Sequence, residues 1–279
     1  MIVDSTARAL LDIAGYYRSK FDVKVVGVTG SVGKTTTKDM IALVVAQKYK
    51  TLKTQGNHNN EIGMPQTLFG LDSSYEAAVI EMGMSHQGEI SRMSMSCQPD
   101  VAVITNIGIS HIENLGTQEN ILKAKLEILD GAAYDAPLIL CRDDKLLAGV
   151  QLHSDRKVYY YSVSKKDCDV YASGVKTVDN SITFTINYEG GKIAAQINCL
   201  GEHNVKNALA AFCVGLALDI PPEDIVKGIA QFKPEGLRQN VTVIDGVTYI
   251  VDCYNAAPDS MKASLSVLSQ AQAEGKRIC

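Results

Sequence analysis

A glycine-rich loop that ends in a lysine and threonines is the segment of this chain best suited to chemistry. Residues 25–37 read VVGVTGSVGKTTT. The glycines allow backbone N–H groups to surround phosphate oxygens, and the start of a helix adds its positive dipole end. The pattern predicts a phosphate-binding loop in which Lys34 contacts the β- and γ-phosphates and the Thr35 hydroxyl binds Mg²⁺.

The loop departs from the strict phosphate-loop pattern at one position. That pattern requires glycine at position 28, where this chain has Val28 between Gly27 and Gly30. The plainer interpretation is a glycine turn between a strand and a helix, with an unrelated lysine. The order of strand, loop, Lys-Thr and helix favours phosphate binding.

Two more polar residues follow predicted strands. Glu81 comes after the apolar run 77–80, and His111 follows the run 101–104 within a few residues. In an open α/β sheet, ligands bind at the carboxyl ends of the strands. Glu81 could hold Mg²⁺ opposite Thr35, or it could be an acid that faces water. His111 is either a ligand at the same edge or a structural histidine.

A polar segment and a helical lysine leave two interpretations open. Residues 57–63 read NHNNEIG, and the amides could bind substrate or nucleotide, or the segment could be a solvated loop. Lys125 lies in the predicted helix 122–129, where spacing alone indicates a solvated lysine.

The elements that position these residues alternate between strand and helix, which is typical of a doubly wound parallel sheet. The expected strands are 24–29, 77–80, 101–104 and 137–140, and the expected helices are 7–17, 35–47 and 122–129. Short continuous apolar strands of this kind are covered on both faces.

The pattern changes near residue 157. Alternating apolar residues predict an antiparallel hairpin, helices return, and a strand pair follows a junction at 233–236. The expected ranges are 182–188 and 193–197 for the hairpin, 204–218 and 222–232 for the helices, 241–244 and 248–251 for the strand pair, 259–273 for a last helix, and 275–279 for the start of a strand.

We therefore expect an α/β protein whose central domain has a phosphate-binding loop, a mostly parallel sheet and an antiparallel extension, followed by the start of a C-terminal α/β domain. The expected division is 1–22 as first helix and linker, 23–233 as central domain and 234–279 as a partial C-terminal domain.

Composition narrows the class of protein. The 279 residues are 46% hydrophobic and 21% charged, with a net charge of −4, which fits a globular protein and gives no sign of a nucleic-acid partner. No apolar run is long enough to cross a bilayer, and the N-terminal residues do not resemble an export signal. We expect a cytoplasmic location and read the seven cysteines as reduced thiols, mostly in the core.

Together these segments resemble the Mur ligases, ATP-dependent amide-forming enzymes of peptidoglycan precursor synthesis. The resemblance is carried by TGSVGKTT at 29–36, NHNNEIGMP at 57–65, EMG at 81–83, NIGISHIENLG at 106–116, AKLEI at 124–128, GEHNVKNALAA at 201–211 and DCYNAAPDSM at 252–261. The second and last of these segments resemble the branch that adds D-alanyl-D-alanine to a UDP-N-acetylmuramoyl-tripeptide. ATP and those two small molecules are therefore the expected substrates.

The resemblance also implies roles for individual residues. Lys34, His111 and Lys125 match catalytic positions, and Lys125 matches a lysine that is carbamylated to help hold the second of a pair of Mg²⁺ ions. The positions that match metal ligands are Thr35, Glu81, His111 and Lys125. The positions that match nucleotide contacts are Gly30, Ser31, Gly33, Lys34, Thr35, Thr36, Asn57, Asn60, Asn204, Asn207, Arg238 and Asp252.

The chain also departs from the family pattern. It has Ala257 where the family usually has asparagine. The family's domain for the UDP-sugar would precede Ala7, and most of its C-terminal domain would follow Cys279. We therefore expect nucleotide binding without complete ligation by these residues alone. The alternatives are another ligase of the superfamily, such as a folylpolyglutamate synthetase, and a nucleotide-binding module without catalysis.

Overall fold

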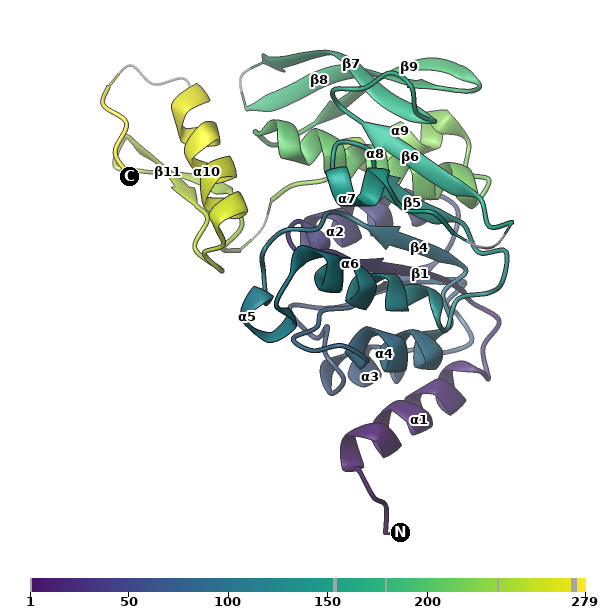
Figure 1. The fold of residues 1–279 in the computed structure, drawn as a ribbon. Helices are drawn as coiled ribbons and strands as arrows, with labels where there is room; N and C mark the ends of the chain where they lie inside the picture. Colours follow the sequence, from purple (N-terminus) through teal and green to yellow (C-terminus); the bar gives the residue numbers. More distant parts are fainter. Residues whose placement is uncertain (1, 153–154, 179, 235, 272–274) are drawn as a thin grey trace.

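A nine-stranded sheet organises the computed structural model, which describes residues 2–152, 155–178, 180–234, 236–271 and 275–279 (Figure 1). The strand order is β2-β3-β1-β4-β5-β6-β7-β8-β9. The first seven strands in this order are parallel, and β8 and β9 are antiparallel to their neighbours. The strands are β1 Lys24–Thr29, β2 Thr51–Lys53, β3 Ala77–Glu81, β4 Val101–Ile104, β5 Leu138–Cys141, β6 Val158–Ser162, β7 Val170–Val178, β8 Ser181–Tyr188 and β9 Gly191–Ile197.

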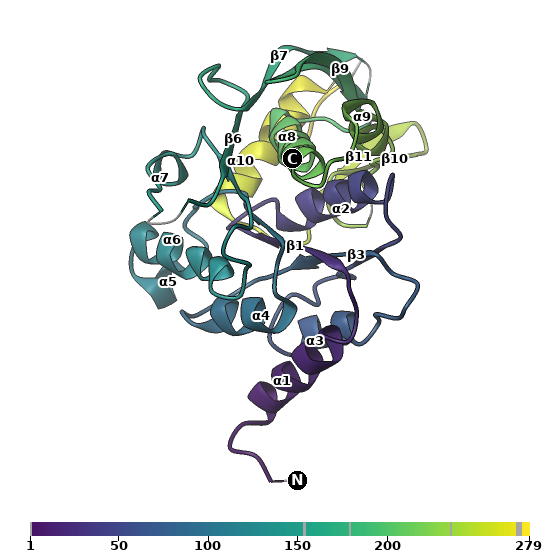
Figure 2. The same cartoon turned by 90° about the vertical axis from the view of Figure 1, so that its right-hand side faces the viewer.

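Helices cover both faces of the parallel strands, which explains why these strands are continuous apolar runs. Helices α2, α8 and α9 lie on one face, and α3, α4 and α6 lie on the other (Figures 1 and 2). Helix α1 packs outside α3 and α4. The helices of this part are α1 Thr6–Arg18, α2 Lys34–Val45, α3 Gly63–Leu68, α4 Glu89–Cys97, α5 Ile112–Leu115, α6 Gln118–Leu126, the 3₁₀ turn η1 Glu127–Leu129, α7 Lys145–Ala148, α8 Glu202–Ala217 and α9 Pro222–Ala230.

The predicted hairpin is confirmed as β8 and β9, and it extends the parallel sheet rather than forming a separate one. Residues along β8 alternate between buried and partly exposed, as expected for a strand with one wet face. The connection runs through β6 and β7, which the sequence reading did not predict. Their aromatic and polar composition hid the parallel pairing of Tyr161 with Val170.

A small C-terminal lobe lies beside α8 (Figure 1). It contains the antiparallel pair β10 Asn240–Ile244 and β11 Val247–Val251, followed by α10 Pro258–Gln270. The predicted junction 233–236 and helix 259–273 each include residues outside the described ones. The strand expected at 275–279 is wrong. These residues are exposed and pair with none of the strands that the structure describes, and the Arg277 side chain donates to the carbonyl of Ala271.

The connectivity determines where a ligand can bind. From β1 the chain passes to β2 and then β3 on one side of β1, and it returns to β4 on the other side. The carboxyl ends of β1, β3 and β4 therefore surround a topological switch point, where open α/β sheets bind ligands. In the described part of the chain, no helix is both long and apolar enough to span a bilayer.

Candidate functional site

The loop between β1 and α2 has the backbone shape of a phosphate cradle. Gly30 has φ of 149° and Gly33, the N-cap of α2, has φ of 82°. A Cβ at Gly30 would lie 1.9 Å from Thr105 Oγ1, so the loop lies too close to the segment after β4 for position 30 to carry a side chain. The Thr105 hydroxyl donates to the carbonyl of Val32 over 2.7 Å and fixes the loop from β4.

A second residue after β4 holds the loop, and the sequence reading gave it no role. Asn106 Oδ1 accepts from the backbone N–H groups of Ser31 at 3.1 Å and Val32 at 2.9 Å. Its place at a strand's carboxyl end, directly before the segment that leads to His111, is the signal that could have identified it.

Lys34 lies where the sequence predicts it, at the first position of α2. Its Nζ donates to the carbonyls of Gly30 at 3.0 Å and Ser31 at 3.4 Å, so it curls over the loop. Burial lowers the Lys34 pKa, the Glu81 carboxylate opposes this shift, and Arg238 adds to it. An anionic group in the loop would therefore favour the charged form of this lysine.

Glu81 ends β3 and faces the loop. Its Oε1 accepts from the Thr35 hydroxyl at 3.2 Å and from Asn59 Nδ2 at 2.8 Å, while its buried Oε2 has no hydrogen-bond partner among the described residues. A buried carboxylate oxygen without a partner is costly unless a cation or donor satisfies it. The carboxylate and hydroxyl are oxygen donors of the kind that Mg²⁺ prefers. This pair of residues fits the predicted Mg²⁺.

Lys125 lies on the buried face of α6, and the spacing-only interpretation of a solvated lysine is wrong. The residue is 2% exposed, and no described carboxylate lies within 4.0 Å of it as an ion pair. Burial, helped by Lys34, holds its pKa well below 10.5. A neutral amine is the form that reacts with carbon dioxide, so this environment suits the predicted carbamate.

His111 lies near the same lysines and remains exposed at the start of α5, with φ of 63°. Burial, Lys125 and Lys34 lower its pKa, in that order, and Glu89 and Glu113 oppose them. The described residues contain no cluster of three or more His, Cys, Asp or Glu side chains that could hold a metal ion. A metal at this edge would need the Thr35 hydroxyl or a carbamate on Lys125 in addition to Glu81 and His111.

A pocket of about 490 Å³ extends from the loop to the C-terminal lobe. Its wall includes Gly33 and Thr36 and brings together four residues predicted to contact nucleotide, which are Asn204, Asn207, Arg238 and Asp252. The guanidinium of Arg238 stacks over the Tyr254 ring at 4.0 Å. Residues far apart in sequence thus converge on one cavity beside the loop.

The asparagines of the segment 57–63, which follows β2, make different contacts. Asn57 and Asn60 are exposed and lie outside the pocket wall, and Asn60 Oδ1 accepts from the backbone N–H of Gly63, the first residue of α3, at 2.8 Å. The amide that reaches the Glu81 carboxylate is that of Asn59, for which the sequence analysis predicts no individual role.

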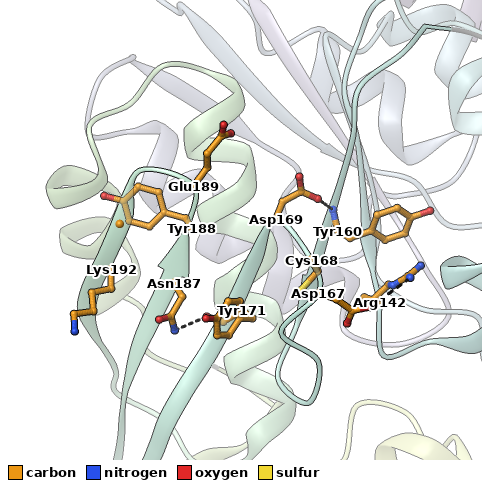
Figure 3. A pocket seen from close by; sticks show the side chains of 11 residues that line it. Arg142, Tyr160, Asp167, Cys168, Asp169, Tyr171, Asn187, Tyr188, Glu189 and Lys192 are labelled. Atoms are coloured by element: carbon orange, nitrogen blue, oxygen red, sulfur yellow. Dashed lines mark hydrogen bonds and ion pairs between the residues drawn. The ribbon is translucent and has the colours of Figure 1, made fainter.

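A larger hollow of about 910 Å³ lies over the antiparallel strands (Figure 3). Two of its polar side chains bond within the sheet: Asp169 accepts from the Tyr160 N–H at 2.8 Å, and Asn187 Nδ2 donates to the carbonyl of Tyr171 at 3.3 Å. No predicted site residue lines it. The smaller pocket beside the loop is therefore the candidate site.

Comparisons with known proteins agree with this fold. The model of the Mur ligase middle domain matches residues 28–215. The UDP-N-acetylmuramoyl-tripeptide–D-alanyl-D-alanine ligase of Bacillus subtilis is 41% identical over 100% of this chain, which covers 60% of that relative. MurF from Acinetobacter baumannii is 35% identical with a TM-score of 0.92, over 98% of this chain and 60% of that one.

A further solved relative carries a nucleotide. MurF ligase from Thermotoga maritima, solved in complex with ADP, is 28% identical with a TM-score of 0.88, over 97% of this chain and 62% of that one.

The fold and the loop define a parallel α/β protein with a phosphate-binding loop. The chain belongs to the Mur ligase family through its middle domain. It spans about 60% of the length of the curated relatives it matches.

Proposed function

We propose that this chain binds ATP and Mg²⁺ and transfers the γ-phosphoryl group during amide-bond formation. The observation that carries the proposal is the Glu81 carboxylate, whose Oε1 faces the Thr35 hydroxyl while its buried Oε2 has no partner. A cation held there would lie beside the phosphates in the loop. The ADP complex of the Thermotoga maritima relative supports the choice of nucleotide.

The proposed substrates are a UDP-N-acetylmuramoyl-tripeptide and D-alanyl-D-alanine. Support comes from the name of the Bacillus subtilis relative at 41% identity. The same relationship favours this branch over a folylpolyglutamate synthetase-like activity.

The proposed reaction has two steps. The terminal carboxylate of the tripeptide attacks the γ-phosphorus and ADP leaves, which gives an acyl phosphate. The amine of D-alanyl-D-alanine then attacks the acyl carbon, phosphate leaves, and the nitrogen loses a proton to give the amide. Lys34 would hold the phosphoryl oxygens, and Arg238 would neutralise charge from the pocket wall.

Mg²⁺ would be held by Thr35 and Glu81, with His111 and a carbamate on Lys125 as further ligands, and it would neutralise charge on the phosphoryl oxygens. The buried, acid-free position of Lys125 supports the carbamate. Lys125→Ala should lose activity that short-chain carboxylates restore. Full activity in the untreated variant would contradict this role.

The proposal also includes the domain boundaries of the chain. We assign residues 23–233 to the nucleotide-binding domain, 1–22 to a leading helix and linker, and 234–279 to part of the next domain. Roles for Asn57 and Asn60 toward nucleotide or substrate, and the cytoplasmic location, stay predictions.

Calorimetry of Mg-ATP binding to this chain tests the nucleotide site, with Lys34→Ala as the disabled variant. Ligation is tested in a chimera in which these residues replace the matching segment of the Bacillus subtilis relative. The chimera should release phosphate and form the extended peptide only when ATP, Mg²⁺ and both substrates are present. Product formation from a folate and glutamate, but not from these substrates, would overturn the substrate assignment.

A further inference from the structure

A row of side-chain hydrogen bonds joins the helix of the phosphate loop to the segment before β10. Thr37 Oγ1 donates to Asn207 Oδ1 over 3.0 Å, and Asn207 Nδ2 donates to Asn204 Oδ1 over 3.1 Å. Asn204 Nδ2 then donates to Gln239 Oε1 over 2.9 Å. At the end of the row, Gln239 Nε2 lies 3.0 Å from His203 Nε2. We call these five side chains the amide relay.

Every hydrogen bond of the amide relay runs from donor to acceptor in the same direction, from Thr37 toward His203. An amide oxygen only accepts and an amide nitrogen only donates, so each link fixes the orientation of the next. His203 Nε2 must accept the last bond, which requires a neutral ring with its proton on Nδ1. Asn204 Nδ2 also donates to the carbonyl of Leu200 at 2.7 Å, so both of its N–H groups are used inside the protein.

Gln239 has an unusual backbone. Its φ is 50°, in the left-handed region that a non-glycine residue occupies only when its surroundings hold it there. The two bonds of its side chain to α8 supply that restraint. The preceding residue, Arg238, lies in the pocket wall and is close enough to Lys34 to influence it electrostatically. The turn at Gln239 therefore determines where Arg238 points.

We propose that Gln239 is a positioning residue that holds the turn before β10 on α8 and so presents Arg238 to the nucleotide. The inference rests on the proposed function, because it adds a residue to the same nucleotide site. Gln239 also lines this pocket, but its side-chain oxygen and nitrogen are both engaged with α8, so it acts through Arg238 and Asn204.

The last link of the relay responds to pH. Burial lowers the His203 pKa, Lys206 adds to this, and the bond to Gln239 and the charge of Asp252 oppose it. Protonation would give Nε2 a hydrogen that faces the donor N–H of Gln239. Acid should therefore break the link in the wild-type chain.

The experiment measures Mg-ADP affinity by calorimetry between pH 5 and 8, because the His203 pKa lies below 6.5, and the His203 tautomer by ¹⁵N NMR. Gln239→Ala and Arg238→Ala should each weaken binding about tenfold, and the double variant should be no weaker than the weaker single variant. Gln231→Ala, at an exposed position after α9, is the matched control and should bind like the wild type.

Gln239→Glu separates positioning from general damage. The introduced carboxylate can only accept, so it needs a proton on His203 Nε2, as the other neutral tautomer or the charged ring supplies. Its ¹⁵N spectrum should show that proton, and its affinity should not fall in acid as that of the wild type does. Additive effects of the two alanine variants, or a wild-type His203 protonated on Nε2, would overturn the proposal. Failure of the wild-type chain to bind Mg-ADP would overturn the proposed function, whereas the tautomer would still decide the relay.

Discussion

The hydroxyl of Thr35 and the carboxylate of Glu81 meet across two strands, with Thr35 Oγ1 donating to Glu81 Oε1 over 3.2 Å. Thr35 follows β1 through the loop, and Glu81 ends the neighbouring strand β3. Asn59 donates to the same oxygen, which orients the carboxylate and leaves Oε2 free of partners among the described residues. The pair thus has the arrangement that the proposed Mg²⁺ site requires.

Glu81→Gln should remove the Mg²⁺ dependence of nucleotide binding while retaining the shape of the side chain. We expect ADP affinity with Mg²⁺ to fall at least about tenfold, because a charge-assisted interaction worth roughly 1.5–3 kcal/mol is lost. Affinity in EDTA should be unchanged or slightly higher, since a negative charge near the phosphates is removed. Calorimetry with and without Mg²⁺ measures both values. Glu119→Gln, on an exposed position of α6, is the control, and equal Mg²⁺ dependence in all three proteins would contradict the metal assignment.

Lys34→Ala should weaken Mg-ATP binding by roughly 1.5–3 kcal/mol for each charge-assisted bond that is lost. Within the described residues, the Lys34 side chain donates only to the loop carbonyls of Gly30 and Ser31, so the variant should fold normally. Lys24→Ala, at the exposed opposite end of β1, is the matched control. Equal affinity of the wild type and Lys34→Ala would show that the loop does not hold the phosphates.

Much of the fold follows from local patterns. The apolar runs of β1, β3 and β4 and the alternation along β8 identify the strands because burial on two faces or one leaves a distinct period. Strands β6 and β7 lacked such a period, because their pairing depends on neighbours distant in sequence. The sequence also predicts the start of a strand at 275–279, but these residues pair with none of the described strands.

The site was less predictable than the fold. The loop residues and Glu81 could be identified from their positions after strands. Lys125 could not, because only tertiary packing buries it, and the contact of Asn59 with Glu81 depends on how the segment after β2 folds back. The amide relay likewise joins α2, α8 and the turn before β10, which no local pattern connects.

Lys125→Met should stabilise the chain in the absence of nucleotide and carbon dioxide. The folded pKa of Lys125 lies well below 10.5, so between these values the unfolded chain binds more protons and stability rises with pH. The variant lacks this cost, so its advantage should be greatest at neutral pH and should shrink as the pH approaches 10.5. Each kcal/mol gained raises the melting temperature by about 2–4 °C.

Thermal denaturation of the wild type, Lys125→Met and Lys123→Met across this pH range measures the effect of Lys125. Lys123 is exposed on the same helix and is the control. An advantage of Lys125→Met that does not change with pH would mean that the buried amine is not the cause.

Asn106→Asp should separate the stability of the loop from its affinity for phosphate. Asn106 Oδ1 accepts from the N–H groups of Ser31 and Val32, at 3.1 and 2.9 Å, and a carboxylate can accept both bonds with equal or greater strength. The melting temperature of the free protein should therefore stay the same or rise. The added negative charge would lie beside the bound phosphates, so Mg-ATP affinity should fall by about tenfold or more, and by less at high ionic strength. Asn106→Ala, which loses both bonds without adding charge, should lower the melting temperature and weaken binding with no added salt dependence. If the two variants behave alike in stability and in salt dependence, Asn106 does not brace the loop in the way that its hydrogen bonds indicate.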